Sequence, residues 1–102
     1  MIPDIPFREE FRELLADGRK TATTRSKRYC KAGETFTAFS MSFTAIAVTK
    51  TTLRNVAENF FKTEGLSTTE DFVRVWDEIH PRKKYADNPE RVIWLHIFKR
   101  IG

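Results

Sequence analysis

The spacing of apolar residues divides the chain into short helical and extended segments. Apolar residues at positions 7, 11, 14 and 15 recur with helical periodicity, and Gly18 stands where a left-handed residue commonly ends a helix. We therefore predict a first helix over residues 7–17. Residues 21–25, which include Thr21, Thr23 and Thr24, predict a short strand because β-branched side chains favour extended backbone.

A long extended segment, over residues 34–50, follows a basic loop. Its apolar positions alternate with period two, but the apolar face switches near Phe39 and again near Ala45. Each switch requires a turn or a bulge, because successive side chains of a strand point to opposite sides. We therefore predict two strands that bend around a small barrel or a strongly curved sheet.

The second half of the chain predicts two more helices and a last strand. An apolar stripe at positions 53, 56, 57, 60 and 61 indicates a helix that ends at Gly65. Ser67–Glu70 has the form of a capping box for a third helix, whose buried stripe at 72, 73, 76 and 79 stops at His80-Pro81. Residues 91–98 are apolar on both faces, which is typical of a central strand. The pattern predicts an α+β domain.

Length and composition limit the class of protein. The chain has 102 residues, of which 40% are hydrophobic and 13% aromatic, so we expect one domain over residues 1–102. No apolar run approaches the roughly 20 residues that cross a bilayer, which predicts no membrane partner. The N-terminus lacks the pattern of a secretory signal, and Cys30 is the only cysteine. We therefore expect a cytoplasmic protein without an internal disulfide.

Positive charge is concentrated in one part of the chain. The formal net charge is +4, and the segment between Gly18 and Gly33 holds six cations and no acid. These cations are Arg19, Lys20, Arg25, Lys27, Arg28 and Lys31, and a smaller cluster follows at Arg82, Lys83 and Lys84. The distribution favours an anionic partner such as a nucleotide or a nucleic acid. A positive surface facing only solvent explains the same pattern.

The residues that follow the first predicted helix carry a recognisable motif. The segment Gly18-Arg19-Lys20-Thr21-Ala22-Thr23-Thr24-Arg25 resembles the signature of the ASCH-domain family, a Gly-x-Lys followed by a Thr or an acid and an Arg. The order of the other predicted elements extends the resemblance over essentially the whole chain. The chain is most similar to the short bacterial enzymes of this family that remove acetate from N4-acetylcytidine. The resemblance implies a small PUA-like β-barrel with about three flanking helices.

The resemblance also implies three catalytic residues. Lys20 and Thr23 match the lysine and threonine of the motif, and Glu64 matches the glutamate that precedes a helix in the second half. Glu58 and Glu70 remain alternatives to Glu64. In this scheme Thr23 is the nucleophile, Lys20 is its base when neutral, and Glu64 orients Lys20 or activates the deacylating water.

Basic and aromatic residues near the motif complete the predicted site. Lys20 and Thr23 are three residues apart and would face opposite sides of a regular strand, so we expect Lys20 in an irregular segment after Gly18. Arg25 is two residues after Thr23 and shares its strand face. We expect substrate contacts from Arg19, Arg25, Arg28, Tyr29 and Lys83.

Two further functions use the same residues. One is an RNA-binding ASCH module without hydrolase activity, and the other is a ribonuclease in which Lys20 and a carboxylate move the 2′-hydroxyl proton. The expected partner is a modified nucleoside or RNA. We expect no metal and no organic cofactor, because His80 and His96 lack the spacing of metal ligands and no Cys/His cluster exists. Nothing in the sequence defines an oligomeric state.

Overall fold

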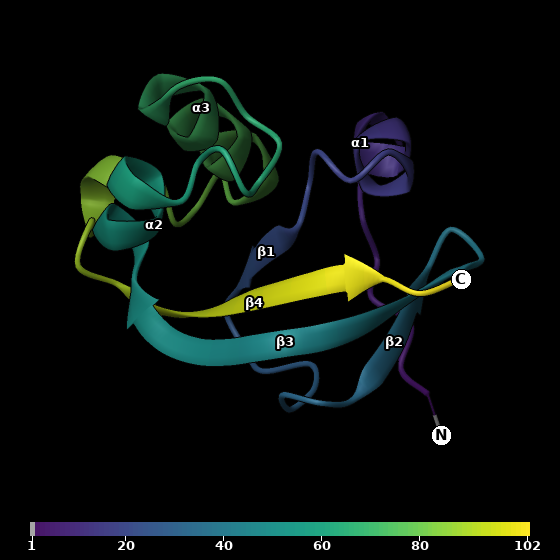
Figure 1. Ribbon diagram of the computed structural model, residues 1–102. Coiled ribbons are helices and arrows are strands. Elements are labelled where there is room, and N and C mark those ends of the chain that lie inside the picture. The colour runs from purple at the N-terminus through teal and green to yellow at the C-terminus, as the bar shows by residue number, and fades with distance from the viewer. Residues whose placement is uncertain (1) are drawn as a thin grey trace.

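The computed structural model describes residues 2–102, which form a curled four-stranded antiparallel sheet with helices at its two ends (Figure 1). The elements in chain order are η1 (Glu9–Phe11), α1 (Arg12–Ala16), β1 (Ala22–Arg25), β2 (Thr35–Ala38), β3 (Met41–Thr52), α2 (Leu53–Asn59), α3 (Thr69–Ile79), η2 (Tyr85–Asp87) and β4 (Val92–Arg100). The strand order β1-β4-β3-β2 makes an open half-barrel. This is the α+β architecture expected from the sequence. No helix within residues 2–102 has the length and apolar character to cross a membrane.

The two changes of face predicted between residues 34 and 50 are confirmed. Phe39 and Ser40 join β2 to β3, and both have positive φ, 51° and 64°. A two-residue hairpin turn of this kind has the twist of the strands that it connects. The second change is a register shift in the pairing of β3 with β4, between Ala45 and Ala47. It bends β3, whose curvature is visible in Figure 1.

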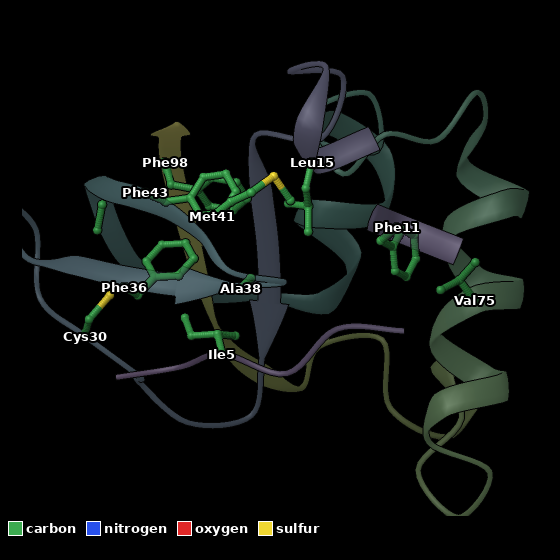
Figure 2. Packing of buried hydrophobic residues seen from close by; sticks show 11 residues of the cluster. Ile5, Phe11, Leu15, Cys30, Phe36, Ala38, Met41, Phe43, Val75 and Phe98 are labelled. Atoms are coloured by element: carbon green, nitrogen blue, oxygen red, sulfur yellow. The ribbon is translucent and has the colours of Figure 1, made fainter. Parts of the chain in front are cut away.

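The last strand is central, as predicted, because β4 pairs with β1 on one side and with β3 on the other. On one face Phe98 packs against Phe36 and Phe43, with ring centroids 5.2 and 5.3 Å away (Figure 2). On the other face Ile93 and Leu95 pack against residues of α2 and α3. The sheet therefore carries a separate hydrophobic cluster on each face.

The first helix begins later than predicted. Residues 7 and 8 precede η1, and Arg8 has extended backbone, with φ −66° and ψ 147°. The segment before them is bound to β2, since the Ile5 N–H donates to the Thr37 carbonyl and the Thr37 N–H to the Pro3 carbonyl. Phe7 is therefore released from the helix and lines a cavity.

The third helix ends as predicted, at Ile79 before His80-Pro81, but it begins one residue later than predicted. Thr68 caps α3, and its Oγ1 accepts from the Asp71 N–H at 3.1 Å, so the predicted capping box is wrong by one residue. Ser67 and Thr68 both carry a hydroxyl that can cap a helix, so the sequence does not distinguish them. In the structure Thr68 has the extended backbone of an N-cap residue. Val75 replaces Ile79 in the buried stripe, and Ile79 is 46% exposed. The predicted second helix is present as α2, which Thr52 caps, but it ends at Asn59, and turns rather than helix lead from there to Gly65.

Candidate active site

The entry to β1 is fixed by two other segments of the chain. The Lys20 N–H donates to the Leu14 carbonyl at 3.0 Å, which holds the chain beside α1 after Gly18. The N–H groups of Thr21 and Ala22 both donate to the Thr63 carbonyl, at 2.7 and 2.9 Å. These bonds bring the turn after α2, which contains residues 63–65, against the start of β1.

A glycine allows this close approach. Gly65 has φ +84°, and a Cβ added there would lie 3.3 Å from the Cβ of Lys20 and 3.1 Å from Cδ1 of Leu14. Both contacts are tighter than ordinary van der Waals packing, and an L-residue is strained at this φ. The residue next to it, Glu64, is thereby placed directly opposite Lys20.

Lys20 and Glu64 form a buried ion pair. The Nζ of Lys20 donates to Oε1 of Glu64 at 2.9 Å and to the Glu64 carbonyl at 3.2 Å, and only 3% and 7% of the two side-chain surfaces are exposed. Burial lowers the pKa of Lys20, and the charge of Glu64 opposes this effect only in part. A buried pair of this kind is a weak source of stability, because its attraction must offset the loss of hydration. Perturbed, buried groups in a cavity are typical of functional sites.

Two threonines and an arginine of β1 line the same cavity as the pair. Oγ1 of Thr23, a buried residue, accepts from Nε of Arg25 at 3.0 Å, and Nη2 of Arg25 donates to the Pro6 carbonyl at 2.7 Å. The hydroxyl of Thr24 donates to Oε2 of Glu64 at 2.6 Å. Thr24 was not predicted as a site residue, because it resembles any other β-branched residue of a strand.

These groups line a cavity of about 450 Å³ at the free edge of β1. Lys20, which precedes β1 as expected, shares the cavity with Thr23. The polar residues of its lining include Lys20, Thr23, Thr24, Arg25 and Glu64. The apolar lining includes Phe7, Phe11, Leu66, Phe72, Val75 and Trp76. Figure 2 shows Phe11 beside the first helix and Val75 on α3 pointing toward one another across the space between these elements.

The predicted substrate-contacting residues separate into two groups. Arg25 and Tyr29 line the cavity, and the guanidinium carbon of Arg25 lies 5.5 Å from the centre of the Tyr29 ring. Arg19, Arg28 and Lys83 are exposed and outside the cavity lining. Arg19 is paired with Asp17 at 2.7 Å, which directs its side chain toward solvent. The alternative carboxylates, Glu58 and Glu70, are also exposed and do not line the cavity.

Two aromatic residues at the cavity were missed as functional candidates. Trp76 and His80 stack with ring centroids 3.8 Å apart, and both line the cavity. Burial lowers the pKa of His80. Helical periodicity predicted that Trp76 is buried, but it does not tell whether a buried residue faces a core or a cavity.

A fully buried histidine, His96, lies on the strand next to Thr23. His96 is opposite Thr23 in the sheet, and its Nε2 accepts from the Tyr29 N–H at 3.1 Å. Burial lowers the pKa of His96, which keeps this nitrogen unprotonated as the acceptor of the bond. No group of three or more His, Cys, Asp or Glu residues within 2–102 is arranged to hold a metal ion.

The sequence matches no family profile and no curated protein. Solved structures are nevertheless similar in fold. The hypothetical protein PH0355 is 14% identical, with a TM-score of 0.75, over 99% of this chain and 100% of that one. An ASCH domain from Lactobacillus crispatus JV V101 is 16% identical, with a TM-score of 0.67, over 97% of this chain and 79% of that one. The protein EF3133 from Enterococcus faecalis V583 is 22% identical, with a TM-score of 0.66, over 87% of this chain and 65% of that one. The curled half-barrel of this chain, with its flanking helices, has the fold of an ASCH domain.

Proposed function

We propose that the chain is an amidohydrolase that removes the acyl group from the exocyclic nitrogen of an acylated cytosine nucleoside, with N4-acetylcytidine as the representative substrate. The observation that carries the proposal is the buried Lys20–Glu64 pair in the same cavity as the hydroxyl of Thr23. A hydroxyl nucleophile needs an adjacent base, and a buried amine of lowered pKa supplies one. The resemblance of the motif to the N4-acetylcytidine enzymes points to the same three residues.

In the first half-reaction Oγ1 of Thr23 attacks the amide carbonyl carbon, and its proton passes to the neutral Nζ of Lys20. The bond that Arg25 Nε donates to Thr23 Oγ1 favours loss of the hydroxyl proton to Lys20, because it stabilises the deprotonated oxygen. The carbon–nitrogen bond then breaks, and Lys20 returns the proton to the departing N4 nitrogen. Cytidine leaves, and the acyl group remains as an ester on Thr23.

In the second half-reaction a water molecule attacks the ester. Glu64 takes a proton from the water, the carbon–oxygen bond to Thr23 breaks, and the proton returns to Oγ1. The released product is acetate together with its acid proton. Thr24 supports this step because its bond to Oε2, at 2.6 Å, holds the carboxylate in one orientation. Lys20 is neutral again at the end of the cycle.

The shape of the cavity supports a planar, partly apolar substrate. A volume of about 450 Å³ lies in the range of small-molecule sites. The Phe7 and Tyr29 rings line it from the N-terminal part of the chain, and Phe72 and Trp76 line it from α3. A nucleobase presents a flat face to such rings and an amide edge to the polar residues of the lining.

The buried pair favours an enzyme over a binding module. Exposed cations bind phosphate without losing their hydration in the free protein, so a module that only binds RNA has no use for a lysine and a carboxylate held together out of water. A ribonuclease would use Lys20 in the same cavity and would cleave unmodified RNA. Assaying unmodified RNA beside the acylated nucleoside separates the two reactions.

The test is incubation of the purified protein with N4-acetylcytidine, with release of cytidine followed by chromatography. We expect release by the wild type and a loss of at least about a thousand-fold in Thr23→Val, which keeps the shape of the residue and removes the nucleophile. Thr49→Val, at an exposed strand threonine outside the cavity lining, is the matched control. A folded wild type without release, or a Thr23→Val variant of wild-type rate, would contradict the proposal.

A further inference from the structure

Beside the site, a row of basic and aromatic residues crosses three strands of the sheet. Thr23 of β1 is opposite His96 of β4, which is opposite Val48 of β3. Two residues along, Arg25 is opposite Trp94, which is opposite Lys50. Directly opposed residues of antiparallel strands share a face, and so do residues two apart on one strand. The row of Arg25, Trp94 and Lys50 therefore lies next to Thr23 on the same side of the sheet.

Cations from the loop after β1 join this row. The guanidinium carbon of Arg28 and Nζ of Lys50 lie 5.5 and 5.4 Å from the Trp94 ring, and Nζ of Lys27 lies 5.1 Å from the Tyr29 ring. We define the basic strip as Lys27, Arg28, Tyr29, Lys50 and Trp94. Its three cations are exposed and its two rings are partly exposed. Lys27 and Tyr29 also line the cavity, so the strip is continuous with the site.

Among the described residues, the three cations of the strip lack a counter-charge, unlike the paired arginines elsewhere on the surface. Arg8, Arg12, Arg19, Arg54 and Arg74 each have a carboxylate within 4.0 Å. Among the described residues, no carboxylate lies within that distance of Lys27, Arg28 or Lys50. Each of these three cations is free to bind an external anion.

We propose that the basic strip binds a single strand of RNA, so that the substrate of the proposed amidohydrolase is an acylated cytosine within a strand. This inference rests on the proposed function. Neighbouring strands are about 4.8 Å apart, so the row spans roughly 10 Å and offers a series of charges and rings. A nucleoside has no phosphate, and a mononucleotide has one phosphate group. A strand supplies a phosphate and a base at every residue, and both are needed to use cations and aromatic rings together.

The test measures binding of a labelled RNA of about eight nucleotides that contains one N4-acetylcytidine, by fluorescence anisotropy. The strip variant is Arg28→Gln with Lys50→Gln. The control is Lys62→Gln with Lys99→Gln, which removes the same charge from exposed lysines outside the strip. We expect wild-type affinity to fall steeply between about 50 and 200 mM salt. In the strip variant the slope of log affinity against log salt becomes about 1.4 units shallower, since each phosphate contact contributes about 0.7. The control keeps the wild-type slope, and circular dichroism checks that both variants fold.

The outcomes separate this inference from the proposed function. If the strip variant and the control variant lost RNA affinity equally, the binding would come from general electrostatic attraction, and the inference about the strip would be overturned. Displacement of the RNA by inorganic polyphosphate as efficiently as by unlabelled RNA would also overturn it, because the rings then contribute nothing. If the protein released cytidine from the free nucleoside but did not bind RNA, the proposed amidohydrolase function would stand and RNA binding by the strip would be rejected. RNA binding through the strip without deacylation in the strand or in the nucleoside would support the strip and contradict the amidohydrolase.

Discussion

The adjacent residues Arg19 and Lys20 each form an ion pair of nearly equal length, but one pair is exposed and the other is buried. Arg19 and Asp17 are 2.7 Å apart in solvent, and Lys20 and Glu64 are 2.9 Å apart in the interior. The exposed pair costs little desolvation and is screened by water and salt, so it contributes little to stability. The buried pair loses most of its hydration and is retained in a cavity with a hydroxyl beside it. Burial, and not the length of the ion pair, is therefore the property on which the proposed chemical role of Lys20 and Glu64 rests.

Removing one partner of the buried pair gives the largest expected effect. Glu64→Gln leaves Lys20 without its counter-charge, and breaking a buried pair from one side typically costs about 3–5 kcal/mol of unfolding free energy. The cost is smaller where Lys20 releases its proton, since burial already lowers its pKa. Release of cytidine should stop after at most one equivalent per enzyme, because the water that removes the acyl group from Thr23 then has no base. Chemical denaturation and the chromatographic assay measure the two effects.

The control for this prediction removes both charges. Lys20→Met together with Glu64→Leu replaces the pair by apolar side chains of similar size, a change that is often neutral or stabilising for a buried pair. We expect the double variant to unfold at higher denaturant than Glu64→Gln and to be inactive. A double variant less stable than Glu64→Gln would show that the pair holds the turn at residues 63–65 in place, and would contradict its assignment as a pair kept for chemistry.

The pH dependence is the next largest effect. Burial puts the pKa of Lys20 lower in the folded protein than in the unfolded chain. Between the two values the unfolded chain binds more protons, so this group makes stability rise with pH and fall as pH drops through the folded pKa. The proposed base is the neutral amine, so kcat/KM should rise about tenfold per pH unit below that pKa and then level off.

The variant Lys20→Arg tests this assignment, because a guanidinium stays protonated over the whole range. We expect it to lose the rising limb together with activity. A wild-type profile that keeps rising to the ordinary pKa of a lysine would contradict a lowered pKa for Lys20. The exposed pair of Arg19 and Asp17 keeps both charges throughout the neutral range, so it should add nothing to this pH dependence.

Removing the hydroxyl of Thr24 has a smaller effect. Thr24→Val deletes the bond to Oε2 of Glu64, and hydrogen bonds to charged groups are worth about 1.5–3 kcal/mol. We expect kcat/KM to fall about tenfold or somewhat more, which corresponds to roughly 1.4 kcal/mol or above, with the slope of the pH profile unchanged. The nearby Thr21→Val is a suitable control, since Thr21 does not line the cavity. Equal losses in the two variants would point to a general effect on β1.

A feature of this structure could be predicted from the sequence when the residues that determine it lie close together in the chain. The Phe39 turn and the Ala45 bulge were found because a change of face is visible within a few residues. Lys20 and Thr23 were predicted from one local motif, and both line the cavity. Glu64 is 44 residues from Lys20, and only the family resemblance suggested that the two residues belong together. No periodicity reports that two distant segments meet.

The walls of the cavity illustrate the remaining limit. The spacing of Phe72 and Trp76 predicted burial correctly, but burial against a core and burial against a cavity give the same pattern. Phe7 reaches the cavity because the segment before η1 binds β2, which is a tertiary effect that local propensity does not contain. Arg19 was expected at the substrate because it belongs to the motif, and its position outside the cavity depends on Asp17.

The smallest expected effect is in the exposed pair itself. Arg19 holds the pKa of Asp17 below its usual range through a side-chain hydrogen bond, so the contribution of this carboxylate is present at neutral pH and lost in acid. Asp17→Asn should leave the thermal midpoint at neutral pH unchanged within error, because the pair is solvated. The same variant releases Arg19, which lies outside the cavity, so KM for N4-acetylcytidine should also stay constant. A fall in KM would mean that Asp17 restrains a substrate-binding arginine, and would give the exposed pair a functional role that its position in solvent does not indicate.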